Sequence, residues 1–470
     1  MEKATNMKKK RQTTVPEAFA SLLFLILAVM IGSIWGGTGV GTPLALSIGF
    51  VSIIAGKCGY GWNDIKEAMC EKVTSILDIF FILLGVGFLI ATWMFSGTVP
   101  TLISYMIRII SAKYVIVLTF ILCAILSLII GTAWGTAGTI GIVMIGLGMT
   151  LGVNMPAMAA AVAGGAHVGQ ILSPMADMVN LTAALGKKDP IETAKRSAYF
   201  VIPAMITTII IYLAIGFFSN QQTASMEEIT IIVDSISSIF NVCIWALIPL
   251  FILLILSILR KPILPTLFIS GLSAIAIGTI INGFPLMAGI SVAHEGFTLA
   301  KMGVDTSAVN PIVLSLVERG GMSSFGSVFI TLFLALGYAG IMVKIGALEV
   351  IVRTLFGHAN HPITLSISTC LIGIITAAGT SNSYLTLLMP VELLGSKYEK
   401  NGWNLLNAAC ISGSVGALIM LLIPWSTTAI YFAGVTGVPT MSALPYNVFI
   451  YGCPIFAVLT SVIRLGWSKN

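Results

Sequence analysis

The amino-acid sequence predicts an all-α polytopic membrane protein with about 10–12 transmembrane helices. Of the 470 residues, 57% are hydrophobic and only 9% are charged, whereas roughly a quarter of the residues in a soluble domain are charged. Many windows approach or exceed the ~18 apolar residues that cross a bilayer. The seven cysteines are scattered through apolar stretches without a metal-binding or disulfide spacing, so we interpret them as small core residues.

The expected spans follow one another along the whole chain. The first begins near Pro16 and is too long for a signal-peptide core, so we expect it to remain in the mature protein. Two apolar pieces, one beginning at Pro156 and one at Gly283, are too short to cross; we predict half-helices or re-entrant hairpins there. The expected spans are 16–36, 41–56, 76–95, 114–130, 139–153, 197–218, 241–259, 263–282, 325–343, 361–378, 404–423 and 445–464.

Basic residues indicate how the chain lies in the membrane. The run from Lys8 to Arg11 precedes the first span and is expected in the cytoplasm, as are the Lys187–Lys188 and Arg260–Lys261 pairs. The polar loop at 221–228 is then expected outside. The net charge of +6 therefore follows membrane topology, and we expect membrane lipid rather than nucleic acid as a partner.

Two long apolar segments are interrupted by glycine and by hydroxyl or amide side chains. The first interruption covers Gly131–Thr139 and the second covers Gly379–Ser383. Unwound backbone is unfavourable in hydrocarbon, because each unpaired polar group there raises the free energy of the protein by several kcal/mol. Broken helices at corresponding places in two halves are typical of the midplane binding site of a secondary transporter.

The two halves of the chain match at a nearly constant offset. Gly131–Thr132 matches Gly379–Thr380 at 248 residues, and Pro174 matches Pro424 at 250. The alternative is that small residues recur in any membrane bundle, because they allow close helix packing. We favour an internal duplication, with a cytoplasmic basic N-terminus (1–15), a first membrane repeat (16–220), a linker and connecting span (221–262) and a second membrane repeat (263–470).

Several motifs resemble those of the NhaC sodium/proton antiporter family. They are Gly131–Ile140, Ser173–Leu181, Arg319–Met322, Ile423–Thr427 and Ala433–Pro439. The resemblance covers most of the chain. It implies a multi-pass secondary transporter of the cytoplasmic membrane, within the wider ion transporter superfamily, with two repeats, re-entrant hairpins and a dimeric elevator. It also implies Na+ and H+ as coupling ions without another cofactor, and one branch of the family consists of malate/lactate antiporters.

The chain departs from the family pattern at two places where the family usually carries intramembrane carboxylates. Gly169-Gln170-Ile171 stands where the family has Gly-Asp-Lys, and Gly413-Ser414-Val415-Gly416 stands where it has Glu-Asp-Ser-Gly. These losses argue against simple competition of sodium and protons for those carboxylates. They also lower the electrostatic cost of admitting an organic anion, which helix N-termini attract.

Candidate binding residues cluster at the interruptions and at the proline segments. Asp177 is either an ion ligand or the cap of a half-helix. His167 either carries a proton or donates to a backbone carbonyl, and Arg319 could clamp a carboxylate. Sodium could be bound by backbone carbonyls and by oxygen-bearing side chains, for which the candidates are Thr132, Thr136, Asp177, Asn180, Thr380, Ser381, Asn382 and Thr427. We find no spacing that indicates a metal site.

The sequence therefore predicts a secondary antiporter that exchanges Na+ and H+, either alone or coupled to a small organic anion of the malate or lactate type. One alternative is an amino-acid or carboxylate transporter without simple Na+/H+ exchange. An ion channel is a weaker alternative, since paired half-helices suit an occluded site better than a continuous pore. An enzyme is not expected, because the sequence shows no metal cluster, zinc-protease motif or convincing catalytic dyad.

Overall fold

The computed structural model describes residues 10–32, 39–107, 109–218, 226–306, 309–356, 361–465 and 467, and every regular element in these ranges is a helix. Nine helices there are long and apolar enough to cross a membrane, or eleven if two bent pairs each count as one span. The predicted class of polytopic all-α membrane protein is confirmed. Lys8 and Lys9, and residues 221–225 of the predicted outer loop, lie outside the described ranges.

The candidate spans are α4 (Leu77–Phe95), α6 (Ala112–Ile130), the segment 133–150, α9 (Met155–Leu172), α11 (Pro190–Phe218), α14 (Ile263–Ile281), α17 (Gly326–Lys344, with the preceding turn η6), α19 (Pro362–Thr380) and α21 (Leu405–Ile419, with the following turn η7). The segment 133–150 combines α7 (Ala133–Thr136), the π-helical η2 (Ala137–Gly141) and α8 (Ile142–Thr150).

The remaining helices are shorter or less apolar. They are α1 (Val15–Met30), α2 (Gly41–Lys57), α3 (Trp62–Thr74), α5 (Thr98–Met106), α10 (Asp177–Gly186), α12 (Met226–Ile239), α13 (Ile248–Ile258), α15 (Leu286–Glu295), α16 (Pro311–Val317), α18 (Ala347–Phe356), α20 (Ser383–Lys400), α22 (Thr427–Thr436), α23 (Thr440–Ala443) and α24 (Val448–Ile463).

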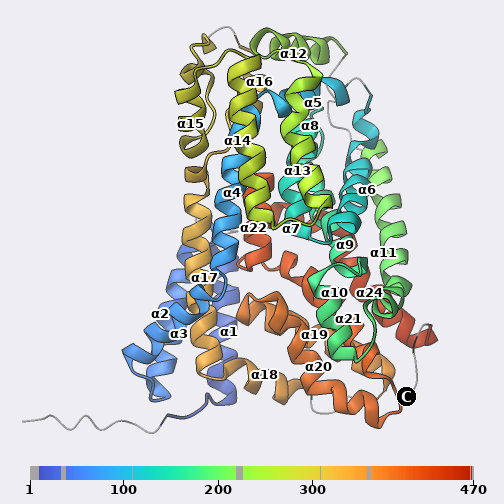
Figure 1. Ribbon diagram of the computed structural model, residues 1–470. Helices are drawn as coiled ribbons and strands as arrows, with labels where there is room; N and C mark the ends of the chain where they lie inside the picture. Colours follow the sequence, from blue (N-terminus) through green and yellow to red (C-terminus); the bar gives the residue numbers. More distant parts are fainter. Residues whose placement is uncertain are drawn as a thin grey trace, which may run out of the picture.

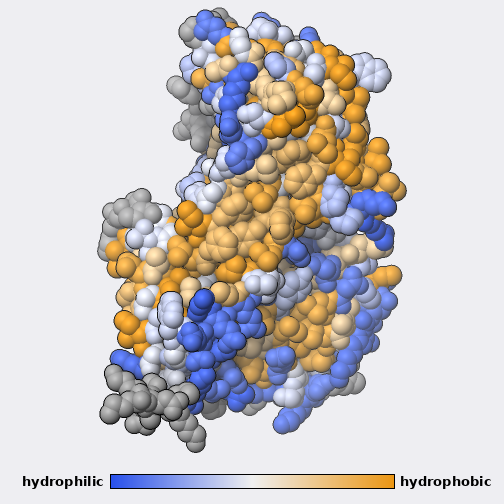
Figure 2. All heavy atoms as spheres, turned by 60° about the vertical axis from the view of Figure 1, so that its left-hand side comes forward, coloured by the Kyte–Doolittle hydropathy of each residue, from blue (hydrophilic) through white to orange (hydrophobic). Residues whose placement is uncertain are grey.

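The bundle has a well-enclosed centre and a hydrophobic exterior. α9 and α21 are 83% and 89% buried, whereas α11 is only 28% buried and lies at the edge of the bundle (Figure 1). α9 lies so close to α6 that a Cβ on Gly169 would come within 2.0 Å of the Ser127 backbone. Only glycine fits at this position. Figure 2 shows hydrophobic side chains over much of one outer face, with hydrophilic ones gathered mainly toward its lower end.

The prediction for one short segment is wrong, and that for the other remains a prediction. The apolar piece beginning at Pro156 belongs to α9, whose 18 residues are long enough to cross a bilayer. Proline stands in the first turn of this helix, where it starts a helix rather than interrupting one. The piece introduced by Gly283 is the ten-residue α15, which is too short to cross. The duplication and the re-entrant hairpins remain predictions.

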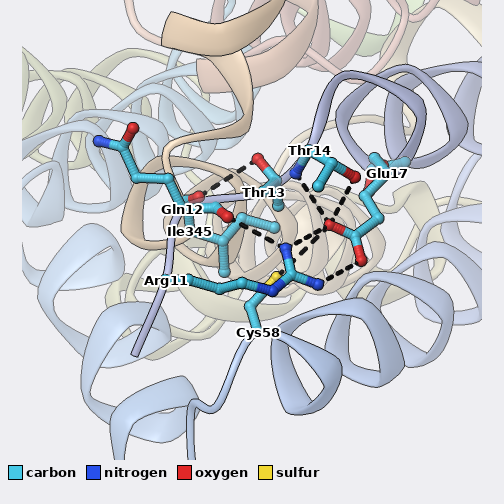
Figure 3. A network of polar contacts seen from close by, with 8 residues as sticks. Arg11, Gln12, Thr13, Thr14, Glu17, Cys58 and Ile345 are labelled. Carbon is cyan, nitrogen blue, oxygen red and sulfur yellow. Dashed lines mark hydrogen bonds and ion pairs between the residues drawn. The ribbon is translucent and has the colours of Figure 1, made fainter. Parts of the chain in front are cut away.

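Residues 10–14, here called the N-terminal strap, tie three elements together at the start of α1 (Figure 3). The Arg11 amide donates to Cys58 O after α2 (3.0 Å), and the Thr13 amide donates to Ile345 O after α17 (3.2 Å). The Arg11 guanidinium pairs with both carboxylate oxygens of Glu17, each at 2.7 Å. This paired geometry is the most favourable for an exposed ion pair.

Candidate functional site

The two predicted interruptions are two-residue helix breaks with the same backbone conformation. α6 ends at Gly131, which is left-handed (φ 81°, ψ 6°), and Thr132 is extended (φ −133°, ψ 131°). α19 ends at Ser381, also left-handed (φ 50°, ψ 34°), and Asn382 is extended (φ −133°, ψ 116°). The equivalent residues are 250 apart, so the predicted pairing of Gly131 with Gly379 is wrong by two positions.

Two further breaks follow the same offset. α9 gives way to α10 through Ser173–Ala176, and the η7 turn after α21 gives way to α22 through Ile423–Ser426. α10 and α22 each have ten residues and each ends at a left-handed residue, Lys187 or Gly437. The helices that follow the four breaks are α7, α10, α20 and α22, and residues at the start of each line the same cavity.

These breaks line one cavity of about 720 Å³. Thr132, Asp177, Asn382 and Thr427 face it from the four breaks, and the Arg260–Lys261 turn between α13 and α14 completes its rim. The free N–H groups and partial positive charge at helix N-termini favour an anion. The hydroxyl, amide and carboxylate oxygens of the breaks can instead coordinate a cation. The same cavity thus offers N–H groups that can bind an anion and oxygen atoms that can bind a cation.

Asp177 has two structural partners and still faces the cavity. Its Oδ1 accepts a hydrogen bond from the Met178 amide, and its Oδ2 accepts one from the Tyr384 hydroxyl, both at 2.9 Å. The first contact stabilises the start of α10, and the second joins α10 to α20. Asp177 is exposed to the cavity, so its contact with the α10 terminus does not remove it from the candidate ligands.

Hydrogen bonds fasten the second break to the start of α22. Ser381 Oγ donates to Trp425 O (3.3 Å), and Thr427 Oγ1 donates back to Ser381 O (3.1 Å). The Trp425 indole N–H donates to Ala378 O, in the last turn of α19, at 2.8 Å. The carbonyl groups freed by unwinding are therefore held in fixed directions beside the cavity.

Half of the predicted site residues line the cavity: Thr132, Asp177, Ser381, Asn382 and Thr427. Three others do not line the cavity but form hydrogen bonds close to the breaks. Thr136 Oγ1 donates to Thr132 O (2.9 Å), and Thr380 Oγ1 donates to Thr376 O (2.7 Å). Asn180 Nδ2 donates to Ala176 O (2.8 Å) and thereby closes the segment between α9 and α10.

Two predicted site residues, His167 and Arg319, lie away from the cavity wall. His167 is 1% exposed, its Nδ1 lies 2.8 Å from Ala163 O, and its ring lies 5.2 Å from that of Phe432. This is the structural environment that the backbone-donor interpretation predicts. Arg319 Nη1 lies 3.1 Å from Met149 Sδ, at the end of α8. Neither residue contributes to the lining of the cavity.

The structure adds several cavity residues to those predicted. Arg260 and Lys261 were expected on the cytoplasmic side of the membrane, and both line the cavity, as does Asp78. Gln170 was noticed only as a departure from a family motif, and it also forms part of the wall. In the described ranges no group of three or more His, Cys, Asp or Glu side chains could hold a metal ion.

A cavity between opposed broken helices in a bundle of membrane spans defines a secondary transporter. Residues 165–465 match the model of the Na+/H+ antiporter family, and residues 1–216 match that of the C4-dicarboxylate anaerobic carrier. The chain belongs to the Na+/H+ antiporter family.

Three relatives cover most of the chain. An uncharacterised Na+/H+ antiporter of Haemophilus influenzae is 31% identical over 98% of this chain and 99% of its own. The malate-2H+/Na+-lactate antiporter of Bacillus subtilis is 30% identical over 84% of each chain. The Na+/H+ antiporter NhaC of Alkalihalophilus pseudofirmus is 28% identical over 91% of each. The protein is a multi-pass membrane antiporter, and its family consists of transporters rather than enzymes.

Proposed function

We propose that this protein exchanges a small organic carboxylate together with sodium and protons, and that both the anion and the sodium ion bind in the cavity at the four helix breaks. The observation that carries the proposal is the meeting of helix N-termini and oxygen-bearing breaks at one cavity. A cavity for cations alone would gain little from converging N-termini, because their partial charge repels cations.

The anion would bind near the starts of α10, α20 and α22. These three helices are eight residues or longer, so each has a developed dipole. One N–H in each first turn is already paired with the side chain of Asp177, Asn382 or Ser426, and the others would bind the anion. Arg260 and Lys261 at the rim add two positive charges on the path to the site. Such charges raise the local concentration of an anion before it binds.

The sodium ion would bind at the breaks themselves. Left-handed Gly131 and Ser381 end the helical hydrogen-bond ladders of α6 and α19, so carbonyl groups of these last turns have no partner within the helix and can offer a lone pair to an ion. Asp177 supplies a negative charge that lowers the cost of binding a cation in the membrane. Because His167 lies away from the cavity, we assign the competing proton to Asp177 instead.

The test is transport by the purified protein in liposomes with imposed sodium and proton gradients. We expect a sodium gradient to drive malate or lactate counterflow in wild type, and Asp177→Asn to abolish the sodium dependence. Asp234→Asn is the matched control, because Asp234 is an exposed residue of α12 that does not line the cavity. Sodium-proton exchange without movement of any carboxylate would restrict the function to the ions, and conductance without coupling would indicate a channel.

A further inference from the structure

The side-chain amide of Gln170 has one enclosed end and one accessible end. Gln170 stands in the last turn of α9, lines the cavity and is only 7% exposed. Its Oε1 is enclosed by protein, so the accessible polar end of the side chain is the donor Nε2. No described residue accepts a hydrogen bond from this nitrogen. The cavity wall therefore contains an N–H donor that is available to a molecule in the cavity.

The acidic side chain on the same stretch of wall does not serve as the partner of Gln170. Gln170 and Met178 line both the cavity and a small adjoining crevice, which places the end of α9 next to the start of α10. Asp177, which precedes Met178, accepts hydrogen bonds from the Met178 amide and the Tyr384 hydroxyl, each at 2.9 Å. The two oxygens of Asp177 are thus held by α10 and α20, and Gln170 Nε2 keeps its capacity to donate.

An amide N–H group in this position suits an anion. A carboxylate has only acceptor oxygens at neutral pH and binds N–H donors, and hydrogen bonds to a charged acceptor are stronger than those between neutral groups. A sodium ion needs oxygen ligands, which Nε2 cannot supply. Glutamine is also uncharged, so its burial in the wall avoids the large desolvation cost of a buried lysine. The donor therefore fits the transported anion rather than the coupling ion.

We propose that Gln170 Nε2 donates a hydrogen bond to the carboxylate of the transported anion, which makes position 170 a determinant of anion affinity. This inference rests on the proposed function, since it assumes that a carboxylate enters the cavity. It adds a ligand that the proposed function does not contain, namely a side-chain donor at the end of α9 beside the N-terminus of α10. Loss of the donor weakens anion binding, and a negative charge in its place weakens it further.

The test measures malate and lactate uptake into liposomes that contain the full-length protein and a sodium gradient. Gln170→Met keeps nearly the length of glutamine without the donor, and its KM should rise by about tenfold. Gln170→Glu keeps the size of the side chain but replaces the donor by a charged oxygen. Its KM should rise further at about pH 8, because the new charge repels the anion. Gln170→Leu replaces Gln170→Met if that variant does not fold.

A second readout separates a contact with the anion from a structural role. A protonated carboxyl group donates through its O–H. The KM of Gln170→Glu relative to wild type should therefore fall as the pH is lowered from about 8 to about 5.5, whereas the ratio for Gln170→Met should stay constant. Asp78 and Asp177 on the same wall are present in wild type as well, so the ratio at each pH isolates the change at position 170.

Ser414→Ala is the matched control. Ser414 lines the adjoining crevice but not the cavity, so this variant should keep the wild-type KM. If a Gln170 variant does not transport, calorimetric titration of the purified protein with malate at saturating sodium measures the same loss as a higher Kd. A wild-type KM in both Gln170 variants, or equal increases in both at every pH, overturns this inference alone. Absence of malate and lactate transport in wild type overturns the proposed function as well.

Discussion

The break after α6 and the break after α19 have the same backbone conformation but different side chains. In the first, left-handed Gly131 lies against the Met175–Ala176 backbone, where a Cβ would come within 3.3 Å. In the second, Ser381 adopts the left-handed conformation with a side chain present. A non-glycine residue there is unfavourable by roughly 1–2 kcal/mol, and the hydrogen bonds between Ser381, Trp425 and Thr427 offset this strain.

The two halves therefore reach the same backbone conformation at these breaks by different means. The first break needs the absence of a side chain, and the second needs a specific set of hydrogen bonds. The charges differ as well, because Asp177 stands at the start of α10 where Thr427 stands at the start of α22. The first half therefore contributes carboxylates to the cavity wall, Asp78 and Asp177, whereas the breaks of the second half contribute neutral oxygens.

The largest expected effect comes from exchanging the two left-handed residues. Gly131→Ala should lower the free energy of unfolding by about 1–2 kcal/mol, because the new Cβ meets both the left-handed penalty and the neighbouring backbone. Ser381→Gly should change it by less than about 1 kcal/mol, since relief of strain opposes the loss of one hydrogen bond. Thermal unfolding in detergent measures both variants, and equal losses would contradict the comparison.

A smaller effect is expected from the indole that fastens the second break. Trp425→Phe removes the donor to Ala378 O and should lower stability by about 1 kcal/mol. The matched substitution in the first half is Trp134→Phe, where the bond between the halves runs from the Tyr431 hydroxyl to the Trp134 backbone carbonyl and is retained. We expect the Trp134 variant to lose less in the same unfolding assay; the reverse order would show that the halves do not differ as described.

The smallest effect lies outside both breaks and gives a reference for them. The Lys10 amine donates to Asp64 at 2.8 Å and lowers the pKa of that exposed carboxyl below its usual range. The contribution of this ion pair to the free energy of unfolding is fully present above the unfolded-state pKa of aspartate, roughly 4. It is lost as the pH falls through the lower folded-state pKa of Asp64. Lys10→Met should thus unfold slightly earlier than wild type at pH 7, with the two midpoints converging in acid. A constant gap would mean that Asp64 is not the cause.

Hydropathy alone was enough to predict the fold class, because long apolar segments with few charged residues are typical of membrane spans and not of soluble domains. The breaks were also predictable, because glycine and hydroxyl residues are unusual in apolar helices. Their register was not. Gly379 resembles Gly131 in sequence, yet it lies inside α19 against Leu348, and the left-handed position falls to Ser381. Residue identity does not determine which residue of a polar run leaves the helix; packing against the next segment does.

The cavity wall was predictable only in part, for a similar reason. Asp177 stood out because a carboxylate in an apolar segment is rare. The place of Gln170 in the wall depends on how α9 packs against α10, which no local sequence pattern records. Arg260 and Lys261 were correctly noticed as basic residues, but their place at the cavity rim follows from the arrangement of α13 and α14.

The N-terminal strap also imposes an order on biosynthesis. Thr13 is synthesised well before its partner Ile345, which lies 332 residues further along the chain. At about 5–20 residues per second, the ribosome needs roughly 20–70 seconds to reach that partner. During this interval the strap has to wait at the membrane surface while later helices are inserted. The strap can therefore form its bond to Ile345 only after α17 has been synthesised. Nascent chains that stop before Ile345 lack this attachment.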